Sequence, residues 1–173
     1  MKTRTHLLAA LALAVALAAC SGDDEIALPC PAIAPLPDAT NMTRFNGDGR
    51  DLTDVDFSAE ISNVNFVCDY EETAIEMSMQ VVFETNRGPA NESGEAQFAY
   101  FVAISKSDTP EQVLTRREFP VTLEFEGNRR RLLYLDELEQ RFPLAPGEDG
   151  NSYVIYLGLM LSRAELDYNR ANR

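Results

Sequence analysis

Apolar and polar residues alternate through the stretch from residue 75 to residue 84. A period of two puts every second side chain on one face of an extended strand, so the stretch predicts a half-buried β-strand. Similar alternation occurs at residues 57–70 and 119–125, with Gly, Pro, Asn and Asp between the runs. Because no long stretch has a helical period, the chain is predicted to be all-β. The apolar positions of the first run are Ile75, Met77, Met79, Val81 and Phe83.

Details inside these runs predict where strands bend or end. The apolar phase changes near Ser62 and Asn63, which indicates a β-bulge or a break between two short strands. Residues 69–73 are expected to form a hairpin turn into the next strand. Pro120 has no N–H for a ladder, so its strand is predicted to lie at a sheet edge or to bulge.

Two other runs, at residues 96–104 and 153–161, are apolar at nearly every position. Such runs are typical of central strands that are covered on both faces. If the core covers only one face, the other meets a partner, and Phe101 is then the candidate contact. Gly158 is expected to admit a close neighbour or a bulge.

These elements predict one antiparallel β-sandwich, immunoglobulin-like or fibronectin-like, with a small β-barrel as the alternative. The chain has no tryptophan, and its cysteines lack the placement of the inter-sheet pair of true immunoglobulin domains. Ser162 and Glu165 match a capping box, so a short C-terminal helix is expected from Arg163 to about Asn169.

The first twenty residues combine a positive start, a short apolar run and a small-small-cysteine step. Lys2 and Arg4 precede a run, residues 7–19, that contains only Leu, Ala and Val. The run is shorter than the roughly 20 residues that span a bilayer, but it suits a secretory signal. The sequence Leu17-Ala18-Ala19-Cys20 resembles the lipobox of bacterial lipoproteins; a plain secreted protein is the alternative.

The resemblance implies that residues 1–19 are a signal peptide and that Cys20 is the lipidated, palmitate-bearing N-terminus that anchors the chain to a membrane. Residues 20–40, acidic and rich in proline, are then a tether, and residues 41–173 a single β-rich domain. In enterobacterial lipoproteins an aspartate directly after the cysteine retains the protein in the inner membrane. Here that residue is Ser21, which favours the periplasmic face of the outer membrane, with the inner membrane as the alternative. The body is similar to small proteobacterial envelope lipoproteins of undefined activity.

Charge and histidine content exclude several classes of protein. The formal net charge is −13, which argues against nucleic acid as a partner, because phosphates require a basic surface. The single histidine, His6, falls within the expected signal, so the mature chain would lack the histidine of Ser-His-Asp triads, zinc sites and haem ligation. With no P-loop, GxGxxG, GxSxG or CxxC motif, neither an enzyme nor a cofactor is expected.

Lipidation of Cys20 would leave two cysteines, Cys30 and Cys68. In an oxidising periplasm this pair predicts a disulfide, with two free thiols or an intermolecular bridge as the alternatives.

Residues 46–56 match a calcium loop only in part. Counted from Asn46, an EF-hand frame places Arg50 where a ligand is needed and Asp51 where a glycine is needed. A solvated loop is therefore expected, without a metal site. Weak calcium candidates are Asp48, Asp51, Asp54 and Asp56.

Arg129, Arg130 and Arg131 form the only basic cluster and follow a turn at residues 126–128. They are interpreted as a solvated hairpin shoulder that protects a sheet edge, or as an anion or partner contact.

The first functional hypothesis is a non-enzymatic binding or scaffolding module, held by lipid in the envelope, with an envelope protein as its partner. The second is a β-domain that binds a glycan, a lipid or calcium. A remote third is a cell-wall hydrolase that uses paired carboxylates.

Overall fold

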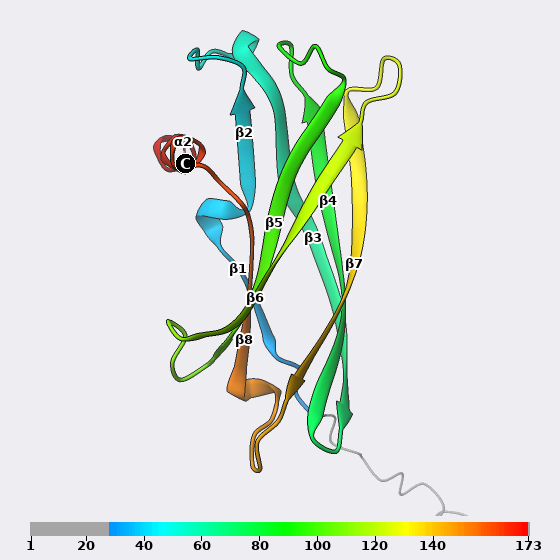
Figure 1. Ribbon diagram of the computed structural model, residues 1–173, viewed down its shortest axis with the longest axis vertical. Coiled ribbons are helices and arrows are strands. Elements are labelled where there is room, and N and C mark those ends of the chain that lie inside the picture. The colour runs from blue at the N-terminus through cyan, green and yellow to red at the C-terminus, as the bar shows by residue number, and fades with distance from the viewer. Residues whose placement is uncertain (1–27, 173) are drawn as a thin grey trace, which may run out of the picture.

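The computed structural model describes residues 28–172, so the signal segment and Cys20 lie outside the described residues. It shows a long, narrow sandwich of two four-stranded sheets (Figure 1). The predicted β-sandwich is confirmed; the sheets do not close into the alternative barrel. The first sheet has the order β1 (Ala32–Pro35), β8 (Tyr153–Leu159), β5 (Glu95–Lys106) and β6 (Val113–Glu124). The second has the order β2 (Asn41–Phe45), β3 (Val55–Glu71), β4 (Ala74–Arg87) and β7 (Arg131–Pro143).

Short helices occupy the connections and the C-terminal end. These are the 3-10 helices η1 (Pro37–Ala39), η2 (Leu52–Asp54) and η3 (Gly150–Ser152), and the α-helix α2 (Arg163–Ala171).

The alternating pattern of β4 becomes one layer of the core. All five of its predicted apolar positions are at most 1% exposed. They share a core cluster with Tyr100 of β5 and with Ile155 and Leu157 of β8, which are fully buried. Burying a large apolar side chain contributes roughly 1.5–3 kcal/mol, so the contact between the two sheets is the main source of stability.

The alternation of apolar and polar residues in β3 changes phase where the sequence predicts it. The strand pairs antiparallel with β4 as far as Glu71 opposite Ala74, and the register shifts between Ile61 and Asn63. This shift lets both halves of β3 keep apolar residues on the core face. The β3–β4 turn also falls within the predicted residues 69–73.

The sequence predicted the places of three of the four strands in the first sheet, β5, β6 and β8. β5 and β8 are its two central strands, as their apolar runs indicate. β6 is an edge strand, and its Pro120 lies opposite Ala99 of β5. An edge strand tolerates proline because one side of its backbone has no partner strand.

The strand order differs from the ABED and CFG sheets of immunoglobulin domains. β2, β3 and β4 form a meander within one sheet, and β7 returns to pair with β4. The likeness to immunoglobulin domains therefore lies in the packing of two sheets and not in their connectivity.

The folded domain begins earlier than the expected boundary at residue 41. β1 runs parallel to β8, from Ala32 opposite Val154 to Pro35 opposite Leu157. The expected tether at residues 20–40 thus contributes a strand to the first sheet. β1 is an edge strand, so prolines 31 and 35 are compatible with its pairing.

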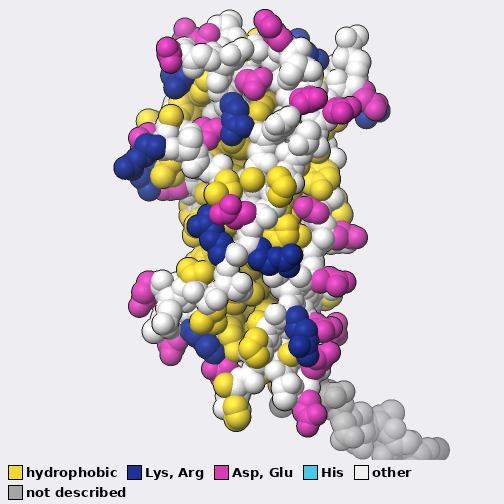
Figure 2. All heavy atoms as spheres, viewed as in Figure 1, with side chains coloured by type: hydrophobic (Ala, Val, Ile, Leu, Met, Phe, Trp, Pro, Cys, Tyr) yellow, Lys and Arg dark blue, Asp and Glu magenta, His cyan; other side chains and the backbone are white. Residues whose placement is uncertain are grey.

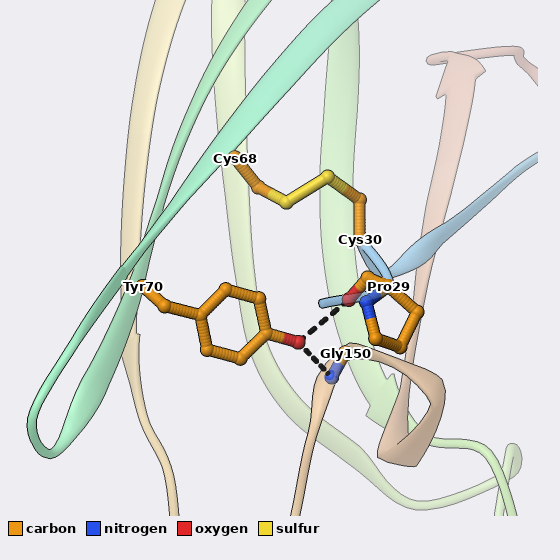
Figure 3. Close-up of a disulfide and its surroundings, with 5 residues drawn as sticks. All are labelled: Pro29, Cys30, Cys68, Tyr70 and Gly150. Carbon is orange, nitrogen blue, oxygen red and sulfur yellow. Dashed lines mark hydrogen bonds between the residues drawn. A yellow bond between two sulfur atoms is a disulfide. The ribbon is translucent and has the colours of Figure 1, made fainter. Parts of the chain in front are cut away.

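The predicted disulfide joins Cys30 to Cys68 and so fastens the start of the chain to β3 (Figure 3). Beside it, the Tyr70 hydroxyl donates to the carbonyl of Pro29 at 2.6 Å and accepts from the N–H of Gly150 at 2.5 Å. A Cβ on residue 150 would lie 2.0 Å from the Pro29 oxygen, so only glycine fits there. Three segments far apart in the sequence are thereby joined at one end of the sandwich.

The helix α2 starts at the predicted capping box. The Ser162 hydroxyl accepts from the Glu165 N–H at 3.2 Å, and the Ser162 N–H donates to the Glu165 carboxylate at 2.7 Å. Near the other end, the Asn169 side chain donates to the carbonyls of Asp38 and Asn41 at 2.9 and 2.7 Å. These bonds fix α2 against η1 and β2. Within residues 28–172, no helix has the length and apolar character needed to cross a membrane.

Candidate functional site

A groove of about 560 Å³ lies where the outer face of the first sheet meets η1 and α2. We call it the Phe101 groove. Its volume falls within the roughly 300–1,000 Å³ of small-molecule and cofactor sites. Figure 2 shows hydrophobic side chains reaching the surface between basic ones on the visible face of the molecule. The groove is lined by Leu36, Pro37, Asp38, Ala39, Phe101, Arg116, Leu159, Met160, Leu161, Leu166 and Arg170.

Phe101 lies in the central strand β5, opposite Gly158 of β8 and Glu118 of β6. Its neighbours Tyr100 and Val102 point into the core, so Phe101 points to the outer face, where it is partly exposed. A Cβ on residue 158 would lie 3.0 Å from the Phe101 ring and 3.0 Å from the Ala39 Cβ. Glycine at 158 therefore lets the ring lie against the sheet, as the sequence predicted for a close neighbour.

Arg116 of β6 forms one wall of the groove. Its guanidinium carbon is 4.6 Å from the centre of the Phe101 ring, a cation–π geometry. Its Nη2 lies 3.1 Å from the Glu118 carboxylate and 3.1 Å from the Met160 sulfur. A thioether is a weak acceptor, so a stronger acceptor in the groove would compete well for this donor.

Arg170 of α2 lies on the other side of the groove, with its Nε 3.0 Å from Oδ2 of Asp38. The Arg170 side chain is 52% exposed and the Arg116 side chain 47%, so water screens both ion pairs. Exposed pairs of this kind contribute about 0–1 kcal/mol. Either guanidinium can therefore change its partner for an incoming carboxylate or phosphate at little cost.

The basic cluster, interpreted as a hairpin shoulder at a sheet edge or as an anion or partner contact, lies elsewhere. Arg131 begins β7 on the second sheet and pairs with Glu84 of β4, and this hydrogen bond holds the pKa of Glu84 below its ordinary value. Arg129 and Arg130 are exposed in the preceding turn. The structure thus does not bring the three arginines together with Phe101.

The weak calcium candidates do not assemble a site. Asp51 and Asp54 cap η2, with the Asp51 N–H donating to the Asp54 carboxylate at 3.0 Å. Asp56 accepts from the Asn91 side chain at 2.8 Å. No group of three or more His, Cys, Asp or Glu within residues 28–172 could hold a metal ion, and this includes Asp48.

Three polar side chains meet where β5 ends, away from the groove. Lys106 donates to Glu148 and to the Tyr153 hydroxyl, and Tyr153 also lies 2.7 Å from the Glu148 carboxylate. Hydrogen bonds from Lys106, Tyr153 and the Ala145 N–H lower the pKa of Glu148 to about 2. A carboxyl group this acidic stays ionised at neutral pH, so it suits a structural ion pair better than proton transfer.

A second hollow, of about 650 Å³, lies on the second sheet, where β3, β4 and β7 run side by side. Glu137 and Glu139 line it, and Glu137 accepts from the Gln80 side chain at 2.8 Å. With two carboxylates and few large apolar side chains, it is less suited than the Phe101 groove to hold an apolar group.

Comparisons of the chain with protein-family models, with curated proteins and with solved structures found no match.

Sequence reasoning identified one member of the groove and missed the others. Phe101 stood out because it lies in a run that is apolar at nearly every position, so one of its faces could meet a partner. Arg116 comes from β6, Met160 follows β8, and Leu166 and Arg170 come from α2, and no local pattern links them. Only the fold brings them together.

Proposed function

We propose that this chain is a non-enzymatic binding module, anchored by lipid in the bacterial envelope, which holds an envelope protein in the Phe101 groove. The observation that carries the proposal is the groove itself, with an aromatic ring, a thioether and two guanidinium groups around an apolar floor. Aromatic residues, methionine and arginine are enriched in protein–protein interfaces relative to the rest of the surface.

The groove is held in shape before any partner binds. Asn169 fixes α2 against η1, and Gly158 seats the Phe101 ring on the sheet. A preformed site loses less conformational entropy on binding, which favours affinity.

The chemistry of the groove indicates what occupies it. Phe101, Leu161 and Leu166 offer contacts for an apolar side chain, and Arg116 offers a donor for a carboxylate beside it. The proposed occupant is a segment of a partner protein that presents an apolar residue next to an acidic one.

The lipobox supports a position close to a membrane. Leu28 is eight residues further along the chain than Cys20, so a fully extended chain between them would reach at most about 28 Å. With Ser21 after the cysteine, the proposed location is the periplasmic face of the outer membrane, with the inner membrane as the alternative.

Photocrosslinking in living cells tests the proposal. A benzoylphenylalanine residue in place of Phe101 should give a crosslinked adduct with one envelope protein, and the Arg116→Glu variant should reduce that adduct several-fold. The matched control places the same photocrosslinker at Leu52, which is 83% exposed in η2 and lies outside the groove. An equal adduct from both positions, or no protein adduct at Phe101, would contradict the proposal.

A second candidate function, the binding of an anionic lipid, is favoured by the same apolar floor and two arginines. Native mass spectrometry of the purified protein distinguishes the two. A bound lipid that disappears in the Arg116→Glu variant would favour the lipid over a protein partner.

A further inference from the structure

The strand β3 has a long free edge. Its neighbour β2 pairs with β3 only as far as Asn41 opposite Glu60, and one more bond joins the Ile61 N–H to the Thr40 carbonyl at 2.8 Å. From Ser62 to Glu71, among the described residues, β3 pairs with β4 alone. In an antiparallel ladder alternate residues point their N–H and C=O groups away from the paired neighbour, so this edge offers a row of free donors and acceptors.

Beyond the bulge at Ser62, residues 63–68 of this edge lack the features that usually protect a free strand. Residues 62–68 read Ser-Asn-Val-Asn-Phe-Val-Cys and contain no charge, proline or glycine. Phe66 is 40% exposed and Val67 is 62% exposed. An uncharged, β-prone segment of this length on an open edge is a template for pairing with another strand.

The other long edges of the sandwich are protected. β6 carries Pro120 and the adjacent charges Arg116 and Arg117. β7 points the carboxylate of Asp136 inward, where it accepts from the Tyr100 hydroxyl at 2.7 Å. Proline and inward-pointing charges are recognised means of preventing edge-to-edge pairing. Their absence from residues 62–68 makes β3 the exposed edge best suited to accept a partner strand.

We propose that residues 63–69 of β3, which lie beyond the bulge at Ser62, pair antiparallel with the same residues of a second copy of this chain, about a two-fold axis at Phe66. The two second sheets then join into one continuous sheet. A two-fold axis requires each residue to face a residue of the same strand in mirror order, so the register can be written from the sequence.

In this register the side chains that lie opposite each other in the two copies are compatible on both faces of the joined sheet. On the core face Phe66 opposes Phe66 and Val64 opposes Cys68, and on the outer face Asn65 opposes Val67 and Asn63 opposes Asp69. No like charges lie directly opposite one another, and cross-strand aromatic pairs are favourable.

The fold leaves room for this pairing. The start of β2 covers β3 only as far as Ile61, so residues 63–69 lie outside the length of β3 that β2 occupies. The paired residues of each copy are therefore clear of its own β2. A hollow of about 380 Å³ between β1 and β3, lined by Ile33, Pro35 and Phe66 among others, gives space for the Phe66 ring of the second copy.

Charge-swapped variants test both the occupant and the register. The full chain, purified from membranes in mild detergent, is expected to sediment as a dimer at high concentration. Phe66→Lys alone and Phe66→Glu alone should each shift it to a monomer, because like charges then face each other. An equimolar mixture of the two variants should recover the dimer.

The matched control is Leu133→Lys, which places the same charge on the edge strand β7 at a residue that is 67% exposed. It should leave the dimer unchanged, and circular dichroism should show that all variants are folded. Added salt should strengthen the wild-type dimer, because each copy carries a net negative charge.

Each other result overturns the inference. A wild-type chain that stays monomeric up to its solubility limit, or a dimer that survives Phe66→Lys, excludes this interface. Failure of the mixture to recover the dimer excludes the Phe66-centred register. Capture of a different protein at this edge, with salt weakening the binding, excludes a second copy as the occupant. None of these outcomes depends on the Phe101 groove, because that groove lies on the first sheet.

Discussion

Glu148 shows how one side chain can hold two distant parts of the chain together. It lies in the loop before β8 and accepts from Lys106 at the end of β5 and from Tyr153 at the start of β8. Burial opposes a positive charge on Lys106, yet its hydrogen bonds to Glu148 and Tyr153 raise its pKa above the ordinary value. The cluster therefore stabilises the fold as an ion pair over a wide range of pH.

The Glu148→Gln variant is expected to lower the melting temperature at neutral pH. The folded-state pKa of Glu148 is about 2, below the ordinary 4.5, so its ionised form favours the folded state. That stabilisation is fully present above about pH 4.5 and is lost as the pH falls toward 2. Thermal unfolding followed by circular dichroism across this range should show the two proteins converging at low pH.

The control for this experiment is Glu126→Gln, which removes the same charge from an exposed turn. It should change the melting temperature much less at neutral pH. A Glu148→Gln variant that matches the wild type at neutral pH, or that stays equally destabilised at pH 2, would contradict the structural role of the cluster.

The limits of sequence reasoning at this scale are visible in the Phe101 groove. A large apolar residue in a continuously apolar run can be identified by inspection, and Phe101 was. No pattern marks Arg116, and Met160 lies in an apolar run that does not single it out. The role of both residues depends on which strands become neighbours. Pairing between strands that are distant in the sequence produces no pattern within either segment.

At the scale of elements, the join between the chain start and β3 depends on the Cys30–Cys68 disulfide. β1 has only four residues and one neighbouring strand, so its own hydrogen bonds hold it weakly. The disulfide closes a loop with a sequence separation of 38, which constrains the unfolded chain and adds to stability.

Replacing both cysteines by serine is expected to destabilise the protein by about 2–4 kcal/mol. Urea unfolding of the variant and of the oxidised wild type measures this difference. Hydrogen exchange should also become much faster in residues 28–35 than in the central strands β5 and β8. Equal stability, or an exchange increase spread evenly over the sandwich, would contradict the role assigned to the disulfide.

Most strands were predictable because their patterns are local. The phase change at Ser62 and Asn63 marked the bulge in β3, and Pro120 marked the edge strand β6. Continuous apolar runs marked the two central strands, and Ser162 marked the start of α2.

The elements that escaped prediction have weak or mixed patterns. β1 lies in a proline-rich segment and gains its order from a parallel pairing with β8, about 120 residues away along the chain. β7 has no clean alternation in its sequence, because the polar residues Asp136 and Gln140 occupy two of its inward positions. Both strands are specified by their neighbours more than by their own residues.

At the scale of the whole molecule, the proposed lipid on Cys20 would hold the β-sandwich at a membrane surface. Cys20→Ala should remove the lipid, so the protein should lose the mass of its acyl chains and leave the membrane fraction. Intact mass spectrometry and membrane flotation measure the two effects. The melting temperature should not change, because residue 20 lies outside the domain that begins near Cys30.

The matched control is Ser21→Ala, which alters the neighbouring residue and keeps the cysteine. It should remain lipidated and float with membranes. A wild-type protein without acyl mass, or a Cys20→Ala protein that still floats, would contradict lipid anchoring through Cys20.

The position of the disulfide also determines how the molecule bears mechanical load. A pull between the membrane and a bound partner would enter the domain at Cys30, next to the short strand β1. Without a covalent link, that force would peel β1 from β8 a few hydrogen bonds at a time. With the link, tension passes directly into β3, the 17-residue strand held by β4 along its length. The domain would thus resist unravelling from its tethered end.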